Sequence, residues 1–205
     1  MNTFTKRGEI AGPAGPLSVA VDTTTDVPSR GLAVVCHPHP LQGGTMDNKV
    51  VTTIARALTQ RGWRTVRFNY RGVGQSGGAW DEGRGEVDDA LAVIAAHRVA
   101  GEPLVLGGFS FGGYVAASAA TKLPEGQPAQ RLVLVAPATV NFKAPPVIAD
   151  TLLIHGEVDD VVPLSATMDW ARPQALPVVV VPGAGHFFHG QLMLLKSLVL
   201  RNFAE

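Results

Sequence analysis

The sequence lacks the features that usually mark a secreted or membrane-bound protein. It contains a single cysteine, Cys36, which excludes an internal disulfide and suits a reducing compartment. No segment approaches the roughly 18 uninterrupted apolar residues of a membrane-spanning helix. The opening residues, MNTFTKRGEIAGPAG, contain no apolar core of a secretion signal. We therefore expect a cytoplasmic protein that does not contact a membrane.

An excess of charge of one sign is also absent. The 17 basic and 17 acidic residues cancel, and the basic ones form no run. Since nucleic acids attract proteins through clustered positive charge, no nucleic-acid partner is expected. Charged residues make up only 17% of the 205 residues and hydrophobic ones 46%, which is typical of a well-filled interior. Residues 1–205 are predicted to form a single domain, either monomeric or homodimeric.

What the sequence does contain is an alternation of short apolar runs and helical patterns. Several runs, such as LAVVC and PVVVVP, are apolar on both faces. Strands of this kind belong to a parallel sheet covered by helices on both sides. The sequence therefore predicts an α/β fold with a mostly parallel central sheet flanked by helices on both faces. The predicted strands are residues 17–22, 31–36, 65–69, 104–107, 132–136, 151–155 and 178–181, and the predicted helices are residues 48–60, 86–98, 112–122, 164–171 and 191–202.

Two serines stand in the pattern G-x-S-x-G, in which glycines flank a nucleophile on a tight turn. Ser110 lies between the predicted strand PLVLGG and the predicted helix FGGYVAASAATK, which is the context that such a nucleophile needs. Ser76 lies in YRGVGQSGG, and no helix can start at once on the glycines that follow it. Ser110 is therefore the predicted nucleophile, and Ser76 is assigned no chemical role. Arg71 is predicted to anchor this loop by hydrogen bonds to backbone or to a nearby carboxylate.

The loop YRGVGQSGG also fits G-x-G-x-x-G between Gly72 and Gly77, the pattern of a dinucleotide-binding turn. Such a turn needs a helix that opens at the third glycine and an acidic residue roughly 20 positions later, and the sequence offers neither. Four of the six histidines occur in HPH and HFFH, but no third ligand stands at a spacing diagnostic of a metal site. No cofactor and no metal ion are predicted.

A serine nucleophile requires a base, and the base requires an orienting acid. The predicted strand TLLIH leads into an acidic turn, beyond the strand end where open α/β sheets build their sites. Asp159 is the preferred acid in this turn, with Asp160 as its rival and Glu157 third. The last predicted strand leads into PGAGHFFHG, which makes His186 the preferred base and His189 the alternative.

Ester cleavage also requires backbone N–H groups aimed at the oxyanion that forms during attack. The N–H of Phe111, directly after the nucleophile, is one predicted donor. The other is predicted in the loop after VVCHP, where Pro38 and Pro40 have no N–H to donate. His39 is preferred there through its backbone, with Leu41 as second choice.

These motifs resemble those of a known family. GFSFGG, HGEVDDVVP and GAGHFF are similar to the nucleophile, acid and histidine motifs of the α/β-hydrolase superfamily. The segment CHPHPLQGGTMDNKVV is similar to the oxyanion side of its small, lidless bacterial branch. The resemblance spans roughly residues 31–189 and implies a catalytic triad of Ser110, Asp159 and His186.

By the same resemblance, His39 and Phe111 form the oxyanion hole. The sequence departs from the family pattern at Asn69, where aspartate is common. It also departs at His37-Pro38, where histidine followed by glycine is common. Neither departure touches the triad.

No cap domain is predicted, because only residues 137–150 separate the two strands between which many superfamily members insert one. We therefore expect an open site for small or flexible acyl groups, with Leu41 and Pro146 contacting the substrate. The expected activity is hydrolysis of a small-molecule carboxylic ester through an acyl-enzyme. A thioesterase, a lactonase or a small-peptide hydrolase would use the same residues. A non-catalytic binding scaffold is the alternative from another class.

Overall fold

The computed structural model describes residues 3–204, and one sheet of eight strands runs through them. The strands are β1 (Thr3–Gly12), β2 (Gly15–Thr24), β3 (Gly31–Cys36), β4 (Trp63–Phe68), β5 (Leu104–Phe109), β6 (Arg131–Val135), β7 (Thr151–Gly156) and β8 (Val178–Val181). Their order across the sheet is β1-β2-β4-β3-β5-β6-β7-β8. β2 is antiparallel to both β1 and β4, and all other neighbours are parallel. The predicted mostly parallel sheet is confirmed.

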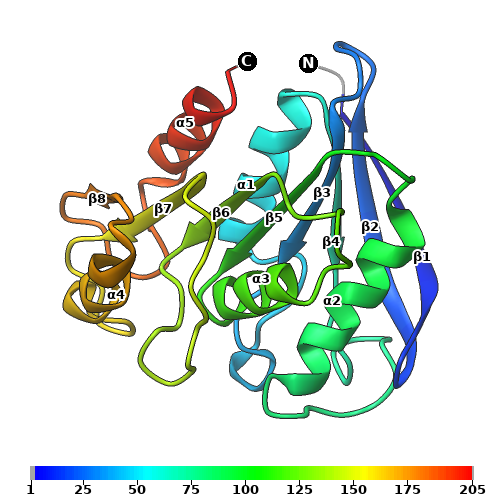
Figure 1. Cartoon of the computed structure of the whole chain (residues 1–205), viewed down its shortest axis with the longest axis horizontal. Coiled ribbons are helices and arrows are strands. Elements are labelled where there is room, and N and C mark those ends of the chain that lie inside the picture. The colour runs from blue at the N-terminus through cyan, green and yellow to red at the C-terminus, as the bar shows by residue number, and fades with distance from the viewer. Residues whose placement is uncertain (1–2, 205) are drawn as a thin grey trace.

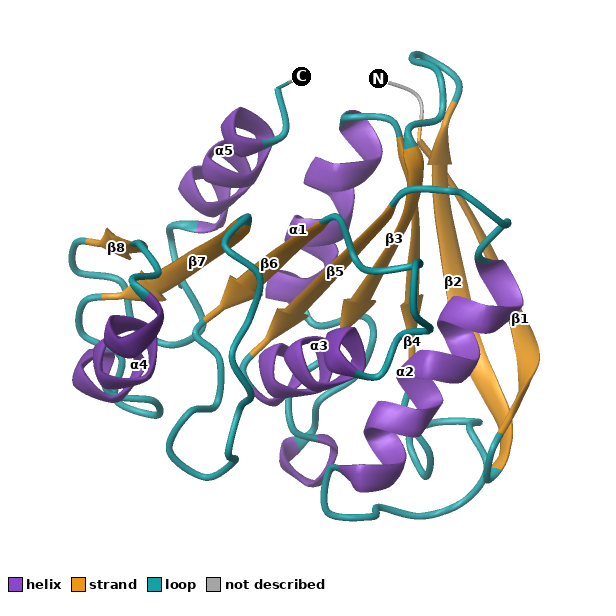
Figure 2. Cartoon of the chain, viewed as in Figure 1, coloured by secondary structure: helices purple, strands orange, loops and turns teal. Residues whose placement is uncertain are grey.

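Helices cover both faces of the sheet (Figures 1 and 2). They are α1 (Lys49–Gln60), α2 (Arg84–His97), α3 (Phe111–Thr121), α4 (Leu164–Ala171) and α5 (Leu192–Asn202). α1 and α5 pack on one face, and α2, α3 and α4 on the other. None of these described helices is long and apolar enough to cross a membrane.

The core therefore has two layers, and β3 contributes to both. Its Leu32, Val34 and Cys36 pack in the layer that contains α2 and α3. Its Ala33 and Val35 pack in the layer that contains α1 and α5. Every residue of this strand is buried, as expected for a parallel strand with helices on both sides.

The predicted helices and strands agree with the structure to within two residues at each end. One strand, β1, is missing from the prediction. Its side chains are almost all exposed, and it pairs with β2 through backbone hydrogen bonds along its whole length. A strand that buries no alternating apolar face has no hydrophobic period, so its sequence carries no strand signal.

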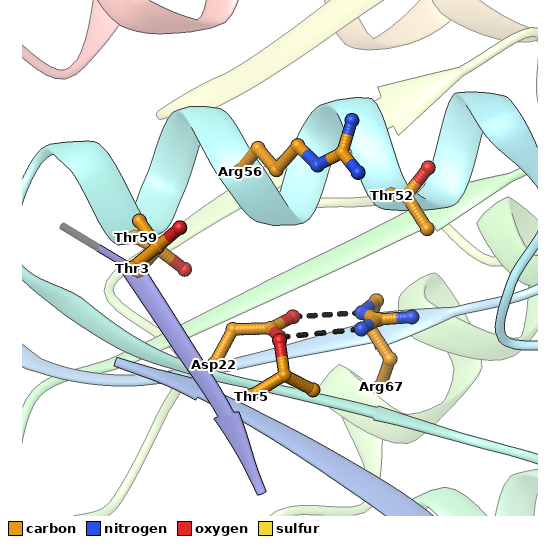
Figure 3. Close-up of a pocket in the computed structure, with 7 residues that line it drawn as sticks. All are labelled: Thr3, Thr5, Asp22, Thr52, Arg56, Thr59 and Arg67. Carbon is orange, nitrogen blue, oxygen red and sulfur yellow. Dashed lines mark hydrogen bonds and ion pairs between the residues drawn. The ribbon is translucent and has the colours of Figure 1, made fainter. Parts of the chain in front are cut away.

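A buried ion pair ties the antiparallel strands β1 and β2 to the parallel part of the sheet (Figure 3). Arg67 of β4 donates from Nε to Asp22 Oδ2 of β2 at 2.7 Å and from Nη2 to Asp22 Oδ1 at 3.2 Å. Thr5 of β1 donates its hydroxyl to the same carboxylate at 2.6 Å. The remaining Arg67 nitrogen, Nη1, donates to Met46 O and to Asp47 Oδ1. Three strands are thus joined by one satisfied cluster.

Residues 137–150 join β6 to β7 without forming a helix or a strand. As Figure 1 shows, this connection is a loop and not a domain. The carboxyl ends of the parallel strands, where the site was predicted, are therefore not covered by a cap.

Candidate active site

Ser110 lies on a strained turn between β5 and α3. Its backbone angles are φ 55° and ψ −120°, a region that residues other than glycine rarely adopt. The turn is possible because two neighbours have no side chain: a Cβ on Gly108 would collide with the Gly112 carbonyl, and a Cβ on Gly112 would collide with the Cys36 carbonyl. The predicted strand-turn-helix setting of Ser110 is confirmed, and the turn places this serine at the carboxyl end of β5.

The structure brings Ser110, His186 and Asp159 into one hydrogen-bonded row. His186 Nε2 lies 3.0 Å from Ser110 Oγ, and His186 Nδ1 lies 2.7 Å from Asp159 Oδ2. An ionised carboxylate only accepts hydrogen bonds, so Nδ1 carries the imidazole proton and donates it to Asp159. Nε2 is then free to accept the hydrogen bond from the serine hydroxyl. This is the arrangement in which an imidazole can take a proton from serine.

The structure also separates the preferred residues from their alternatives. Asp160 is exposed, and the carboxylate of Glu157 accepts a hydrogen bond from Gly183 N at 2.8 Å, which ties together the turns after β7 and β8. His189 is exposed and stacks near Phe187, with ring centroids 5.8 Å apart. Within the described residues, neither acidic alternative is bonded to His186, and His189 is not bonded to Ser110.

Asp159 is held as an ionised carboxylate. Burial by itself would raise its pKa, but hydrogen bonds from His186 and from the backbone of Val162 and Val161 outweigh burial, and the net pKa is lowered. The two backbone groups donate to Oδ1 at 2.7 and 2.9 Å. Oδ2 is therefore left to face His186.

Two backbone N–H groups beside the serine are not engaged. Within the described residues, neither His39 N–H nor Phe111 N–H donates to any acceptor. Phe111 is the first residue of α3, whose opening N–H groups have no partner inside the helix. His39 precedes the short 3-10 helix η1 (Pro40–Gln42) and lines the same cavity as Ser110. Both groups are available to a negatively charged oxygen.

The cavity beside Ser110 has a volume of about 110 Å³. It is lined by Pro38, His39, Gln42, Gly43, Gly44, Asn48, Ser110, Val161, His186 and Phe187. Leu41 and Pro146, which were expected to contact the substrate, are not among these residues. Leu41, in the η1 turn, is 68% exposed. Pro146 is exposed in a loop that is tied to the segment after α4, because Val147 N donates to Gln174 Oε1 at 2.8 Å.

Comparison with known proteins shows the family of this chain. A family model described as serine aminopeptidase, S33, matches residues 29–149, which is more than half of the chain. The chain belongs to the α/β-hydrolase superfamily of serine hydrolases. The resemblance inferred from the motifs is thereby confirmed.

Solved structures extend the similarity over nearly the whole hydrolase. An α/β serine hydrolase homologue from Coxiella burnetii is 41% identical, with 96% of each chain covered and a TM-score of 0.87. A serine hydrolase without a lid from Xanthomonas campestris is 40% identical, with 100% of this chain and 95% of that chain covered and a TM-score of 0.89. An uncharacterized protein of Rickettsia prowazekii (strain Madrid E) is 32% identical over 195 residues, which cover 86% of this chain and 79% of that protein.

Two buried ionisable groups of the hydrolase lie near the site but are not proton-transfer groups. His37 donates from Nδ1 to Pro38 O at 2.7 Å and accepts from Tyr70 N at Nε2, at 3.2 Å. Burial lowers the pKa of His37 to about 3, so the ring is neutral. Burial raises the pKa of Cys36 to about 12, so it remains a thiol. His37 thus joins the loops after β3 and β4.

The loop YRGVGQSGG is held by its own side chains. Ser76 Oγ donates to Asn69 O at 2.9 Å and accepts from Ser18 N at 3.0 Å, which leaves it a structural role. Arg71 forms an ion pair with the buried Asp89 at 2.8 Å and also donates its backbone N–H to that carboxylate. The prediction that Arg71 anchors the loop to a carboxylate is confirmed.

The sequence did not indicate the aromatic residues that hold His39. The His39 ring lies 4.6 Å from Trp80, 5.3 Å from Phe111 and 6.0 Å from Phe142, measured between ring centroids. Trp80 and Phe142 come from loops far from His39 in the chain, and an isolated aromatic residue in a loop gives no sequence signal. The ring of His39 therefore packs against three aromatic side chains beside the cavity.

Proposed function

We propose that this hydrolase cleaves carboxylic esters of small or flexible acyl groups through an acyl-enzyme intermediate. The observation that carries the proposal is the row of hydrogen bonds from Ser110 Oγ to His186 at 3.0 Å and from His186 to Asp159 at 2.7 Å. Ser110 is the nucleophile, His186 the general base and acid, and Asp159 the group that orients the imidazole.

In the first step, Ser110 Oγ attacks the ester carbonyl carbon while His186 Nε2 takes the hydroxyl proton. The carbonyl electron pair moves onto oxygen, and its return expels the alcohol, which takes the proton back from His186. Water then attacks the acyl-Ser110 bond in the same way and releases the acid. Asp159 remains ionised throughout and stabilises the imidazolium, in keeping with its lowered pKa.

The oxyanion of each tetrahedral intermediate is assigned to the N–H groups of His39 and Phe111. Both lie beside Ser110 and neither has another acceptor within the described part of the chain. One such donor contributes on the order of 10²–10³ in rate. A group that is free in the resting protein loses no hydrogen bond when the oxyanion forms.

The shape of the site favours short acyl groups. Its cavity of about 110 Å³ is small beside the roughly 300 Å³ at which pockets for drug-sized ligands begin. Val161 and Phe187 line it and remain 48% and 45% exposed, which provides an apolar rim for a flexible chain. Because residues 137–150 form a loop and not a cap domain, nothing covers the alcohol portion of the ester. This portion is left in solvent and contributes little to selectivity.

A small-peptide hydrolase is the second candidate, because the matching family model is described as a serine aminopeptidase. An aminopeptidase must also hold the charged amino group of its substrate. None of the residues that line the cavity is acidic, so an ammonium group would lie there without a counter-charge. Esters, which carry no such group, fit the cavity better.

The proposal is tested with a substrate panel on the purified protein and on Ser110→Ala. p-Nitrophenyl acetate and butyrate should be cleaved faster than the octanoate, the corresponding thioesters and aminoacyl p-nitroanilides. Cleavage of the short esters by Ser110→Ala at the parent rate would refute the assignment of the nucleophile. Failure of a fluorophosphonate probe to label Ser110 would favour a binding scaffold without turnover.

A further inference from the structure

A second histidine, His155, lies beside Asp159. His155, near the end of β7, is completely buried. Its Nε2 lies 2.8 Å from Val162 O and 3.4 Å from Asp159 Oδ2. A carbonyl oxygen only accepts hydrogen bonds, so Nε2 carries the proton. The other ring nitrogen, Nδ1, has no hydrogen-bond partner within the described residues.

The contacts of His155 converge on the turn that carries Asp159. Val162 accepts from His155 through its carbonyl and donates its own N–H to Asp159 Oδ1 at 2.7 Å. His155 therefore ties Val162, the last residue of the turn, to β7. The bond from Val162 N to the Asp159 carboxylate closes the same turn. This fixes which carboxylate oxygen faces His186.

We propose that His155 is a positioning residue that sets Asp159 for its hydrogen bond to His186. Its Nε2–H holds the turn through Val162 O, and the same nitrogen lies 3.4 Å from the Oδ2 that His186 uses. The role rests on the proposed function of Ser110 and His186. His155 touches neither of these residues through a hydrogen bond and acts only through Asp159.

His155 acts through its N–H dipole and not through a charge. Burial lowers the pKa of His155, and the nearby His186 lowers it further. The bond to Val162 O and the charge of Asp159 act in the opposite direction but do not outweigh burial. The ring is therefore neutral. An apolar side chain at this position would avoid burying an unpaired Nδ1, but it would leave Val162 O without a donor. Histidine thus supplies the donor for Val162 O and leaves its own Nδ1 buried without a partner among the described residues.

The test compares His155→Leu, which removes the donor, with His155→Gln, which retains an N–H at the end of a side chain of similar length. His155→Leu should lower kcat for p-nitrophenyl acetate about 10- to 100-fold with little change in KM, because Asp159 loses its alignment. Its kcat/KM profile should move to lower pH on the acidic side, because the imidazolium loses its aligned carboxylate. His155→Gln should recover most of both changes.

Ile154→Ala serves as the matched control for lost stability. Ile154 is the neighbouring residue of β7, and it is buried in the opposite layer of the core. This variant should lower the Tm while leaving the pH profile of the parent. The proposal is refuted if His155→Leu retains the kcat and the pH profile of the parent, or if His155→Gln is no better than His155→Leu.

A measurement without turnover separates this proposal from the proposed function. The proton between His186 Nδ1 and Asp159, which lie 2.7 Å apart, should give a far-downfield proton NMR signal without any substrate. The signal should shift or disappear in His155→Leu and return in His155→Gln. An unchanged signal in His155→Leu would overturn the positioning role, even if Ser110→Ala had already disproved the esterase activity.

Discussion

The molecule contains two buried polar clusters that look alike and differ in what they leave open. Asp22 and Arg67 form an ion pair at 2.7 Å with side chains 10% and 6% exposed. Asp159 and His186 also meet at 2.7 Å, in side chains 0% and 3% exposed. In the first cluster, the two groups are an acid and a base whose charges neutralise each other. In the second, the histidine is also bonded to the hydroxyl of Ser110, which lies on a strained backbone.

Cavity size does not distinguish the two clusters. Figure 3 shows the side chains around a cavity of about 130 Å³ beside Asp22 and Arg67, and the cavity beside Ser110 is of about 110 Å³. The difference is in the donors: within the part of the chain that the structure describes, the N–H groups of His39 and Phe111 are unengaged, whereas the Arg67 guanidinium is bonded at all three nitrogens. Matched buried charges support a fold, and unengaged donors beside a strained nucleophile support chemistry.

The largest effect is expected from Asp159→Asn. The amide keeps the shape of the side chain but no longer selects the imidazole tautomer, so ester turnover should fall about 10⁴-fold. Steady-state kinetics with p-nitrophenyl acetate measures this loss. The exposed neighbour provides the control, since Asp160→Asn should retain the parent rate. A tenfold or smaller loss in Asp159→Asn would place the orienting acid elsewhere.

The same isosteric change in the other cluster should act on stability instead. Asp22→Asn removes the buried counter-charge of Arg67 and leaves only the half-exposed Asp47 to pair with it, so the free energy of unfolding should fall by about 3 kcal/mol. Urea denaturation measures the fall, and turnover per folded molecule should be unchanged. Adding Arg67→Met to Asp22→Asn should recover much of the stability. If instead turnover fell and stability held, the two clusters would not be separate.

Acid should lower the unfolding free energy of the protein through His37. Its folded pKa, about 3, lies below the ordinary value of about 6.5, so the stability gained from the neutral ring is present above pH 6.5 and is lost as the pH falls toward 3. Between pH 7 and pH 5 the loss is about 2 kcal/mol. Urea titrations should show a flatter pH dependence in His37→Gln. The same change at an exposed histidine, His189→Gln, is the control and should keep the pH dependence of the parent. Equal slopes of unfolding free energy against pH in His37→Gln and the parent would contradict the prediction.

The smallest effect is expected from the second G-x-S-x-G serine. Ser76→Ala removes hydrogen bonds to Asn69 O and from Ser18 N, and should cost about 1 kcal/mol of unfolding free energy. Turnover should stay within about twofold of the parent, since Ser76 is bonded to backbone and not to an imidazole. Thermal denaturation and ester kinetics on the same sample check both statements. A marked loss of rate would bring this loop into the reaction.

Most of the fold was predictable because its signals are local. The strand β3 is apolar at every position and was predicted with its correct ends, as were β8 and α4. The exposed edge strand β1 was missed because its pairing with β2 uses the backbone, which every sequence possesses. The site followed the same division: Ser110 was identifiable from the strand, turn and helix that adjoin it in the chain.

Contacts between distant segments were less predictable. Leu41 and Pro146 were expected at the substrate site, yet neither lines the cavity beside Ser110: Leu41 is largely exposed, and Pro146 lies in a loop tied to the segment after α4. The role of His155 beside Asp159 also had no sequence signal, because a histidine at a strand end does not indicate which loop folds back onto it.

By itself, the sequence determined the alternation of strands and helices, the glycines that permit the turn at Ser110, and the order of serine, acid and histidine. These depend on hydrophobic period and local sterics, which act over a few residues. The sequence preferred Asp159 among its acidic neighbours, but only the tertiary structure brought it to 2.7 Å from His186 and placed His186 3.0 Å from a serine 76 residues away. That choice depends on the register of β5, β7 and β8 and on the packing of the whole core, which no short segment encodes.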